Sequence, residues 1–182
     1  MAKTVALIIG SLRKDSINRK LAKALQDLAG DRLEFHELHI GDLPHYNEEL
    51  WADLPEAVAR LKDRVEHSDA VLAITPEYNR SYPGVIKNAL DWASRPYGDN
   101  SWSGKPAAVT GTSPGAIGAA VAQAHLKNDM LNFDMVVMHQ PEAYIQWKPE
   151  AFAADGTISD ESVRKFLAAY VDAFVAFVEK HG

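Results

Sequence analysis

The chain has 182 residues and a formal net charge of −6, with 47% hydrophobic and 24% charged residues, the composition of an ordinary globular protein. This length predicts a single domain over residues 1–182 with a substantial core. The charge argues against nucleic acid or an anionic membrane as the main partner. Because the chain contains no cysteine, disulfides, thiolate nucleophiles and cysteine-bound metals are excluded. The first apolar stretch is too short for a signal peptide or a membrane span, so we expect a cytoplasmic protein without membrane insertion.

Short apolar runs alternate along the chain with longer amphipathic segments. Most of these runs are continuously apolar, which is typical of strands that are buried on both faces. They predict strands at 4–9, 33–38, 70–75, 106–112 and 133–138.

The segments between the runs carry helix start signals. Ser16 is placed to cap a helix directly after the first strand. The stretch 53–56 predicts another helix, with Asp53 as its cap and proline in its first turn. A third helix is expected to open at 83–84. Ser159 is the expected cap of a long C-terminal helix with apolar residues at helical spacing.

Five strands alternating with helices predict a doubly wound α/β sandwich with right-handed crossovers. In such sheets, ligands bind outside the carboxyl ends of the strands, at the point where the strand order reverses. We therefore expect the loops after the first, third and fourth strands to share one rim, and any binding site to draw on these three loops.

The first of these loops, GSLRKDSIN at 10–18, leads from a buried strand into a helix. A helix N-terminus presents unpaired N–H groups and a partial positive charge. Ser11 and Ser16 add hydroxyls, Arg13 adds a guanidinium and Asn18 adds an amide, so the loop suits a phosphate monoester. The alternative is an ordinary strand-to-helix turn with a serine cap.

The second loop begins the segment PEYNRSYPGVIKNALDW at 76–92. Two prolines stiffen it, and the aromatic, amide and hydroxyl groups between them are suited to line a flat heteroaromatic ring. The alternative is a rigid turn with Tyr78 and Tyr82 packed on the surface.

The third loop, GTSPGAIG at 111–118, contains glycines that allow the backbone to approach a ligand closely. It also matches the G-x-S-x-G pattern of serine hydrolases around Ser113. Against a hydrolase, Pro114 has no N–H to donate to an oxyanion. The histidine order also fits poorly, because only His181 follows the strands, while His125 and His139 lie in no obvious loop after a strand.

Other patterns fail on their spacing. Gly10 lacks the further glycines of a dinucleotide-binding fingerprint. His36 and His39 are three residues apart around a strand end, which does not bring them together, so we interpret them as surface histidines. No metal site is expected.

Together, the segments at 10–18, 76–92 and 111–118 resemble the NADPH-dependent FMN reductase family of flavodoxin-like proteins, particularly its bacterial quinone and chromate reductase branch. The resemblance covers nearly the whole chain, and its middle segment is the most specific. It implies a flavodoxin-like three-layer sandwich, with a five-stranded parallel sheet of order 2-1-3-4-5 and helices on both faces. The chain departs from the family pattern at 97–103 and 119–122, which concern substrate preference and any subunit interface.

The resemblance also implies non-covalent FMN as cofactor and NADPH or NADH as co-substrate. It assigns the FMN phosphate to Ser11, Arg13, Ser16, Ile17 and Asn18. It assigns the isoalloxazine ring to Pro76, Glu77, Tyr78 and Asn79. The pyrimidine side of the ring or the ribityl chain is assigned to Ser113, Pro114 and Gly115. No side chain need act as acid or base, so no catalytic residue is expected. Tyr78, Tyr82 and Trp102 are candidates for the apolar walls of the substrate slot.

In this interpretation, a nicotinamide passes hydride to the flavin, and quinones or similar small-molecule acceptors then take two electrons in the same place. Flavin, chromate and azo compounds are further candidate acceptors, and a homodimer or homotetramer is expected from the resemblance. The alternative is a flavodoxin-type electron carrier without its own NAD(P)H activity. Such carriers usually have a tighter hydroxyl-rich phosphate loop and a strongly acidic surface, so the loop with Arg13 favours the enzyme.

Overall fold

A parallel sheet forms the centre of the structure, a computed structural model that describes residues 2–153 and 155–182. Its strands are β1 (Lys3–Ile9), β2 (Leu33–Glu37), β3 (Ala70–Ile74), β4 (Pro106–Ser113), β5 (Val136–Val137) and β6 (Tyr144–Gln146). The strand order is β2-β1-β3-β4-β5, with β6 paired separately to β4. Each of these pairings is parallel. The predicted fold class and strand order are confirmed.

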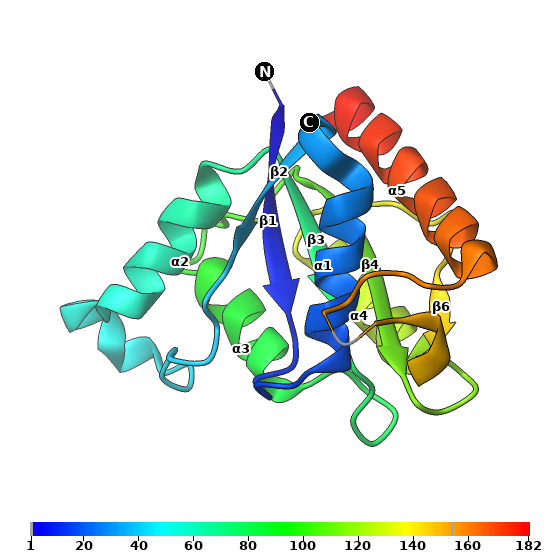
Figure 1. Cartoon of the computed structure of the whole chain (residues 1–182). Helices are drawn as coiled ribbons and strands as arrows, with labels where there is room; N and C mark the ends of the chain where they lie inside the picture. Colours follow the sequence, from blue (N-terminus) through cyan, green and yellow to red (C-terminus); the bar gives the residue numbers. More distant parts are fainter. Residues whose placement is uncertain (1, 154) are drawn as a thin grey trace.

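Helices cover both faces of this sheet (Figure 1). One layer holds α1 (Ile17–Ala29) and α5 (Glu161–His181), and the other holds α2 (Glu56–Glu66), α3 (Gly84–Ala93) and α4 (Ala120–Asn132). Short 3-10 helices lie at Gly30–Arg32, Glu48–Asp53 and Pro149–Ala151.

Strand β1 shows why the apolar runs do not alternate with polar residues. Val5, Leu7 and Ile9 lie in the core cluster under α1 and α5. The residues between them, Ala6 and Ile8, lie in the cluster under α2, α3 and α4. From Val5 to Ile9 both faces of the strand are buried, so every position in this stretch is apolar.

Two helix starts differ from the prediction. The cap of α5 is Asp160 rather than Ser159, and its Oδ1 accepts hydrogen bonds from the second and third helical N–H groups at 2.7 and 3.1 Å. Asp53 does not cap α2, because it ends the preceding 3-10 helix. At α5 a neighbouring carboxylate takes the capping role from the expected serine, whereas α2 begins after Pro55 with no side-chain cap.

The predicted strand at 133–138 is wrong over its first half. Phe133 closes α4, and Asp134 takes a left-handed φ of 61°, so pairing with β4 begins only at Val136. Strand β6, which was not predicted, takes the same side of β4 further along and pairs with Gly111–Ser113. The fifth position of the sheet is therefore divided between two short strands.

The backbones of β4 and Thr75 approach so closely that only glycine fits at position 111. A Cβ on Gly111 would lie 1.9 Å from the Thr75 carbonyl oxygen, and a backbone atom at the end of a sheet strand cannot move away cheaply. We predict that Gly111→Ala lowers the free energy of unfolding by about 3 kcal/mol, measured by urea denaturation. Gly84→Ala is the control, because a Cβ there meets nothing within 4 Å. Equal losses in both variants would contradict the steric explanation.

Candidate functional site

The loops after β1, β3 and β4 leave the sheet at one edge, the lower edge in Figure 1, opposite the two chain termini. Hydrogen bonds continue across the strand ends at this edge. The Gly10 N–H donates to the Ile74 carbonyl oxygen at 2.9 Å, and the Thr75 N–H donates to the Thr110 carbonyl oxygen at 2.9 Å. The first two loops therefore start beside one another, and β4 continues past them to Ser113 at the same end of the sheet, which confirms the predicted rim.

Asn18 joins the first loop to the third. Its Nδ2 donates to the Thr112 carbonyl oxygen at 3.0 Å, and its Oδ1 accepts from the Thr112 N–H at 3.0 Å. Strand β3 pairs with β4 only as far as Thr110, so this amide satisfies backbone groups that β3 does not reach. Asn18 is 2% exposed and Thr112 is 0% exposed. In this structure the Asn18 side chain holds two loops together, and its contact with a phosphate stays a prediction.

The first loop presents uncompensated positive charge at the rim. Ser11 and Ser16 are buried, and the Ser16 Oγ caps α1 by accepting from the Arg19 N–H at 3.4 Å. The first turn of α1 contains no acidic residue, so its free N–H groups and partial charge face the rim. Arg13 is exposed, and within residues 2–153 and 155–182 it makes no ion pair.

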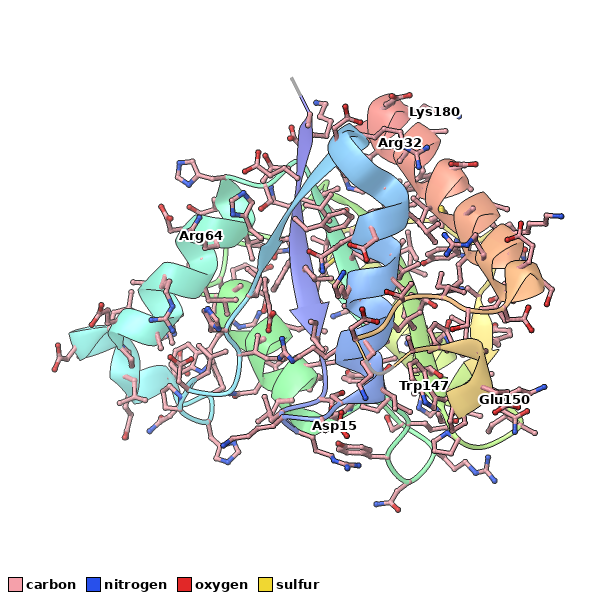
Figure 2. The ribbon with its side chains drawn as sticks, viewed as in Figure 1. Asp15, Arg32, Arg64, Trp147, Glu150 and Lys180 are labelled. Carbon is pink, nitrogen blue, oxygen red and sulfur yellow. The ribbon has the colours of Figure 1, made fainter. Side chains whose placement is uncertain are left out.

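Asp15 is the one acidic residue of this loop (Figure 2). Its carboxylate lies 2.7 Å from the Lys20 Nζ, and the hydrogen bond from Lys20 lowers the pKa of Asp15. Asp15 is therefore ionised and paired near neutral pH, and its charge is offset mainly by Lys20, with a smaller contribution from Arg13.

The second loop contains a tight hairpin. The Tyr78 N–H donates to the Ser81 carbonyl oxygen at 2.8 Å, and the Ser81 N–H donates back to the Tyr78 carbonyl oxygen at 3.0 Å. The two residues between them, Asn79 and Arg80, have φ angles of 50° and 67°, as in a type I′ turn. Asparagine tolerates this conformation well, whereas arginine pays a cost of about 1 kcal/mol. Strained backbone of this kind clusters at functional sites.

The third loop packs against β6. A Cβ on Gly118, which has a φ of +55°, would lie 2.5 Å from the Ile145 nitrogen. The Gln146 Nε2 donates to the Pro114 carbonyl oxygen at 3.1 Å. Gln123, which is buried, donates from Nε2 to the carbonyl oxygens of Gly118 at 3.3 Å and Ala143 at 3.1 Å. The sequence reasoning missed Gln123 because its partner segment lies beside β6, which was not predicted.

The structure does not support the hydrolase alternative. The His125 Nδ1 lies 3.4 Å from the Ser81 Oγ rather than near Ser113. The Ser113 Oγ donates to the Gly115 carbonyl oxygen at 3.3 Å, and α4 begins only at Ala120. An elbow would need the helix to follow the serine directly.

Trp102 does not lie at the rim, so its predicted place in a substrate slot is wrong. It is fully buried, and its Nε1 donates to the Leu90 carbonyl oxygen at 3.0 Å. The surrounding segment is fastened to α2 by Lys62, whose Nζ donates to the carbonyl oxygens of Arg95 and Asp99, both at 2.9 Å. This segment follows the end of α3, whereas the rim lies at the beginning of that helix.

The fold and the rim define a flavodoxin-like α/β protein in which the N-terminus of α1, free of acidic residues in its first turn, lies beside the loops that follow β3 and β4. A family model described as NADPH-dependent FMN reductase matches residues 3–149. A 2-hydroxy-1,4-benzoquinone reductase from a Burkholderia species is 47% identical over 178 residues, which cover 98% of this chain and 97% of that protein. A quinone reductase from Pseudomonas putida is 48% identical over 177 residues, covering 97% of this chain and 95% of that protein. The chain belongs to the NADPH-dependent FMN reductase family.

Solved structures agree with this assignment. FerB, a flavoenzyme NAD(P)H:(acceptor) oxidoreductase from Paracoccus denitrificans, is 72% identical, with 100% of both chains covered and a TM-score of 0.98. A WrbA-like flavodoxin from Agrobacterium tumefaciens, 15% identical with a TM-score of 0.65, shares the fold. The predicted family, an FMN- and NAD(P)H-dependent oxidoreductase family, is confirmed, while the individual site residues stay predictions.

Within residues 2–153 and 155–182, none of the helices combines the length and the hydrophobicity needed to span a membrane.

The pairing of Asn18 with Thr112 generates a prediction with a matched control. Asn18→Ala leaves two buried backbone groups without partners, so we expect it to lower the free energy of unfolding by at least about 2 kcal/mol. Asn88 makes an equivalent pair with the segment that follows β2, accepting from the Tyr46 N–H at 2.8 Å and donating to the Pro44 carbonyl oxygen at 2.9 Å. Urea denaturation should show a loss in both alanine variants, whereas FMN titration should show weaker binding only for Asn18→Ala. Equal FMN affinity in the two variants would show that the link between the first and third loops through Asn18 does not support FMN binding.

Proposed function

We propose that this protein reduces quinones and similar small-molecule acceptors with NAD(P)H, using non-covalent FMN bound at the rim of the sheet. The observation that carries this proposal is the convergence of three loops at one edge, in a chain that belongs to the FMN reductase family. When bound, FMN supplies the hydride and electron transfer between nicotinamide and acceptor.

The first loop fits the phosphate of FMN. A phosphate monoester carries close to two negative charges, and charge-assisted hydrogen bonds bind such groups well. The loop provides the guanidinium of Arg13, the hydroxyls of Ser11 and Ser16, and the N–H groups of Ile17 and Asn18 at the start of α1. This donor set, with Asp15 already paired to Lys20, supports binding of a dianion despite the net charge of −6.

The second and third loops fit a flat ring. Pro76 is buried and restricts the backbone at the start of the second loop, so the main-chain groups through Asn79 are held for the polar edge of the ring. Residues 113–115 approach from the other side. Tyr78 is exposed and offers an apolar wall for a nicotinamide and then for an acceptor. Flavin, chromate and azo compounds are further candidates for the same place.

We also propose a homodimer or homotetramer located in the cytoplasm. Tyr78 and Ile117 of the rim loops and Leu131 near the end of α4 are large apolar side chains exposed on the monomer, which supports association of subunits. The use of NAD(P)H supports the cytoplasmic location. Sedimentation analysis showing a monomer would contradict the assembly.

Arg13→Ala tests the phosphate site. Removal of the guanidinium is expected to weaken FMN binding by about 1.5–3 kcal/mol, the range for hydrogen bonds to charged groups, measured by fluorescence titration. Arg32→Ala is the control, because Arg32 pairs with Asp172 at 2.7 Å at the opposite end of the molecule from Asp15 (Figure 2). An unchanged FMN affinity in Arg13→Ala would remove this residue from the site.

Anaerobic mixing with NADPH tests the reaction itself. We expect NADPH to bleach the visible absorption of the FMN-loaded protein, and a quinone added afterwards to restore it. A protein that keeps its oxidised spectrum with both NADPH and NADH would be an electron carrier rather than a reductase, and the proposal would fail.

A further inference from the structure

The carboxylate of Glu77 lies against helix α4. Its Oε2 accepts hydrogen bonds from the N–H groups of Val121 at 3.1 Å and Ala122 at 3.3 Å. Helix α4 has no side-chain cap of its own at this end, because the capping position is Ala119, with a left-handed φ of 62°. The Glu77 side chain is 10% exposed. The N-terminus of α4 is therefore capped by a residue of the second rim loop.

The same loop contacts α4 at two further points. The Ser81 Oγ lies 3.4 Å from the His125 Nδ1, and the Tyr82 hydroxyl donates a hydrogen bond to the Asp129 carboxylate. Positions 121, 125 and 129 are each four residues apart, so they share one face of the helix. The second loop is laid along this face.

The third rim loop is fastened to the same end of α4. The Gly118 carbonyl oxygen accepts from the Gln123 Nε2 at 3.3 Å, and the Gly118 N–H donates to the Gly115 carbonyl oxygen at 3.1 Å. The first turn of α4 thus holds both of the loops that are expected on the two sides of the ring.

We propose that Glu77 is a positioning residue of the flavin site, which sets the separation of the second and third loops through the N-terminus of α4. This inference rests on the proposed function, because the separation matters only if a ring lies between the loops. The carboxylate suits the role because it meets two unpaired N–H donors and the positive end of the helix dipole. Arg80 lies 3.6 Å from its other oxygen, Oε1. The loops are then arranged before the ligand arrives, so binding costs less ordering.

The test compares Glu77→Ala and Glu77→Gln with a matched cap variant. Asp160 caps α5 by accepting two backbone N–H groups, so Asp160→Ala removes the same chemistry from another helix. For each full-length variant, we would measure the FMN Kd by fluorescence titration, the Tm, and kcat and KM for NADPH at saturating FMN.

We expect Glu77→Ala to raise the FMN Kd by about 10-fold to 100-fold, the factor that corresponds to losing a charge-assisted hydrogen-bonded group. Glu77→Gln should show a smaller rise, because its amide oxygen can still accept both N–H groups and only the negative charge is lost. At saturating FMN, kcat should stay below the wild-type value in both variants, because the displaced loop still misplaces the ring. Asp160→Ala should lower the Tm while the FMN Kd stays within about twofold.

Two results would overturn the positioning role. One is a lower Tm in the Glu77 variants with a wild-type FMN Kd and kcat. The other is an FMN Kd that rises as much in Asp160→Ala as in Glu77→Ala, which would trace the effect to global stability. If Glu77→Ala does not fold, the same criteria apply to Glu77→Gln. A wild-type protein that NADPH does not reduce would refute the proposed function instead, whereas a reducible wild type matched by both Glu77 variants would refute only this inference.

Discussion

The amide of Asn18 takes the place of a strand beside the end of β4, and the geometry of the site depends on this substitution. Strand β3 ends at Ile74, whereas β4 continues to Ser113, so the last backbone groups of β4 would otherwise be buried without partners on that side. Because Asn18 belongs to the first turn of α1, satisfying Thr112 also fixes the helix N-terminus. One pair of hydrogen bonds thereby joins the helix end that suits phosphate to the third rim loop.

The features that could be predicted from the sequence were those determined by residues close together in the chain. Continuous apolar runs identified β1, β3 and β4, and the alternation with helices led to the doubly wound sheet and its shared rim. The errors involve contacts between distant residues. Strand β6 exists because it pairs with β4, and Asn18 meets a residue 94 positions away. The spacing of apolar residues along the chain does not identify such distant partners, so neither β6 nor the burial of Trp102 could be predicted.

The same limit applies within the site. The sequence shows which rim loops carry hydrogen-bonding groups, but it does not show where they point. Asn18 and Glu77 both stood out as polar residues of ligand-binding loops, and both side chains are directed at backbone groups of the protein. Arg13, in contrast, projects from its loop exposed. Burial separates these cases, because the buried amide of Asn18 and carboxylate of Glu77 already have backbone partners, whereas the exposed guanidinium of Arg13 is accessible to a ligand.

The contacts that buried loop side chains make with backbone groups explain how a rim made of loops can be rigid. The left-handed conformation of Asn79 and Arg80 is unfavourable on its own and persists only where surrounding contacts determine it. The hairpin bonds between Tyr78 and Ser81 and the contacts along α4 supply that constraint. The helix layer thus holds the backbone of the second loop in place. A loop held in this way keeps its backbone groups arranged before any ligand binds, which lowers the ordering cost of binding.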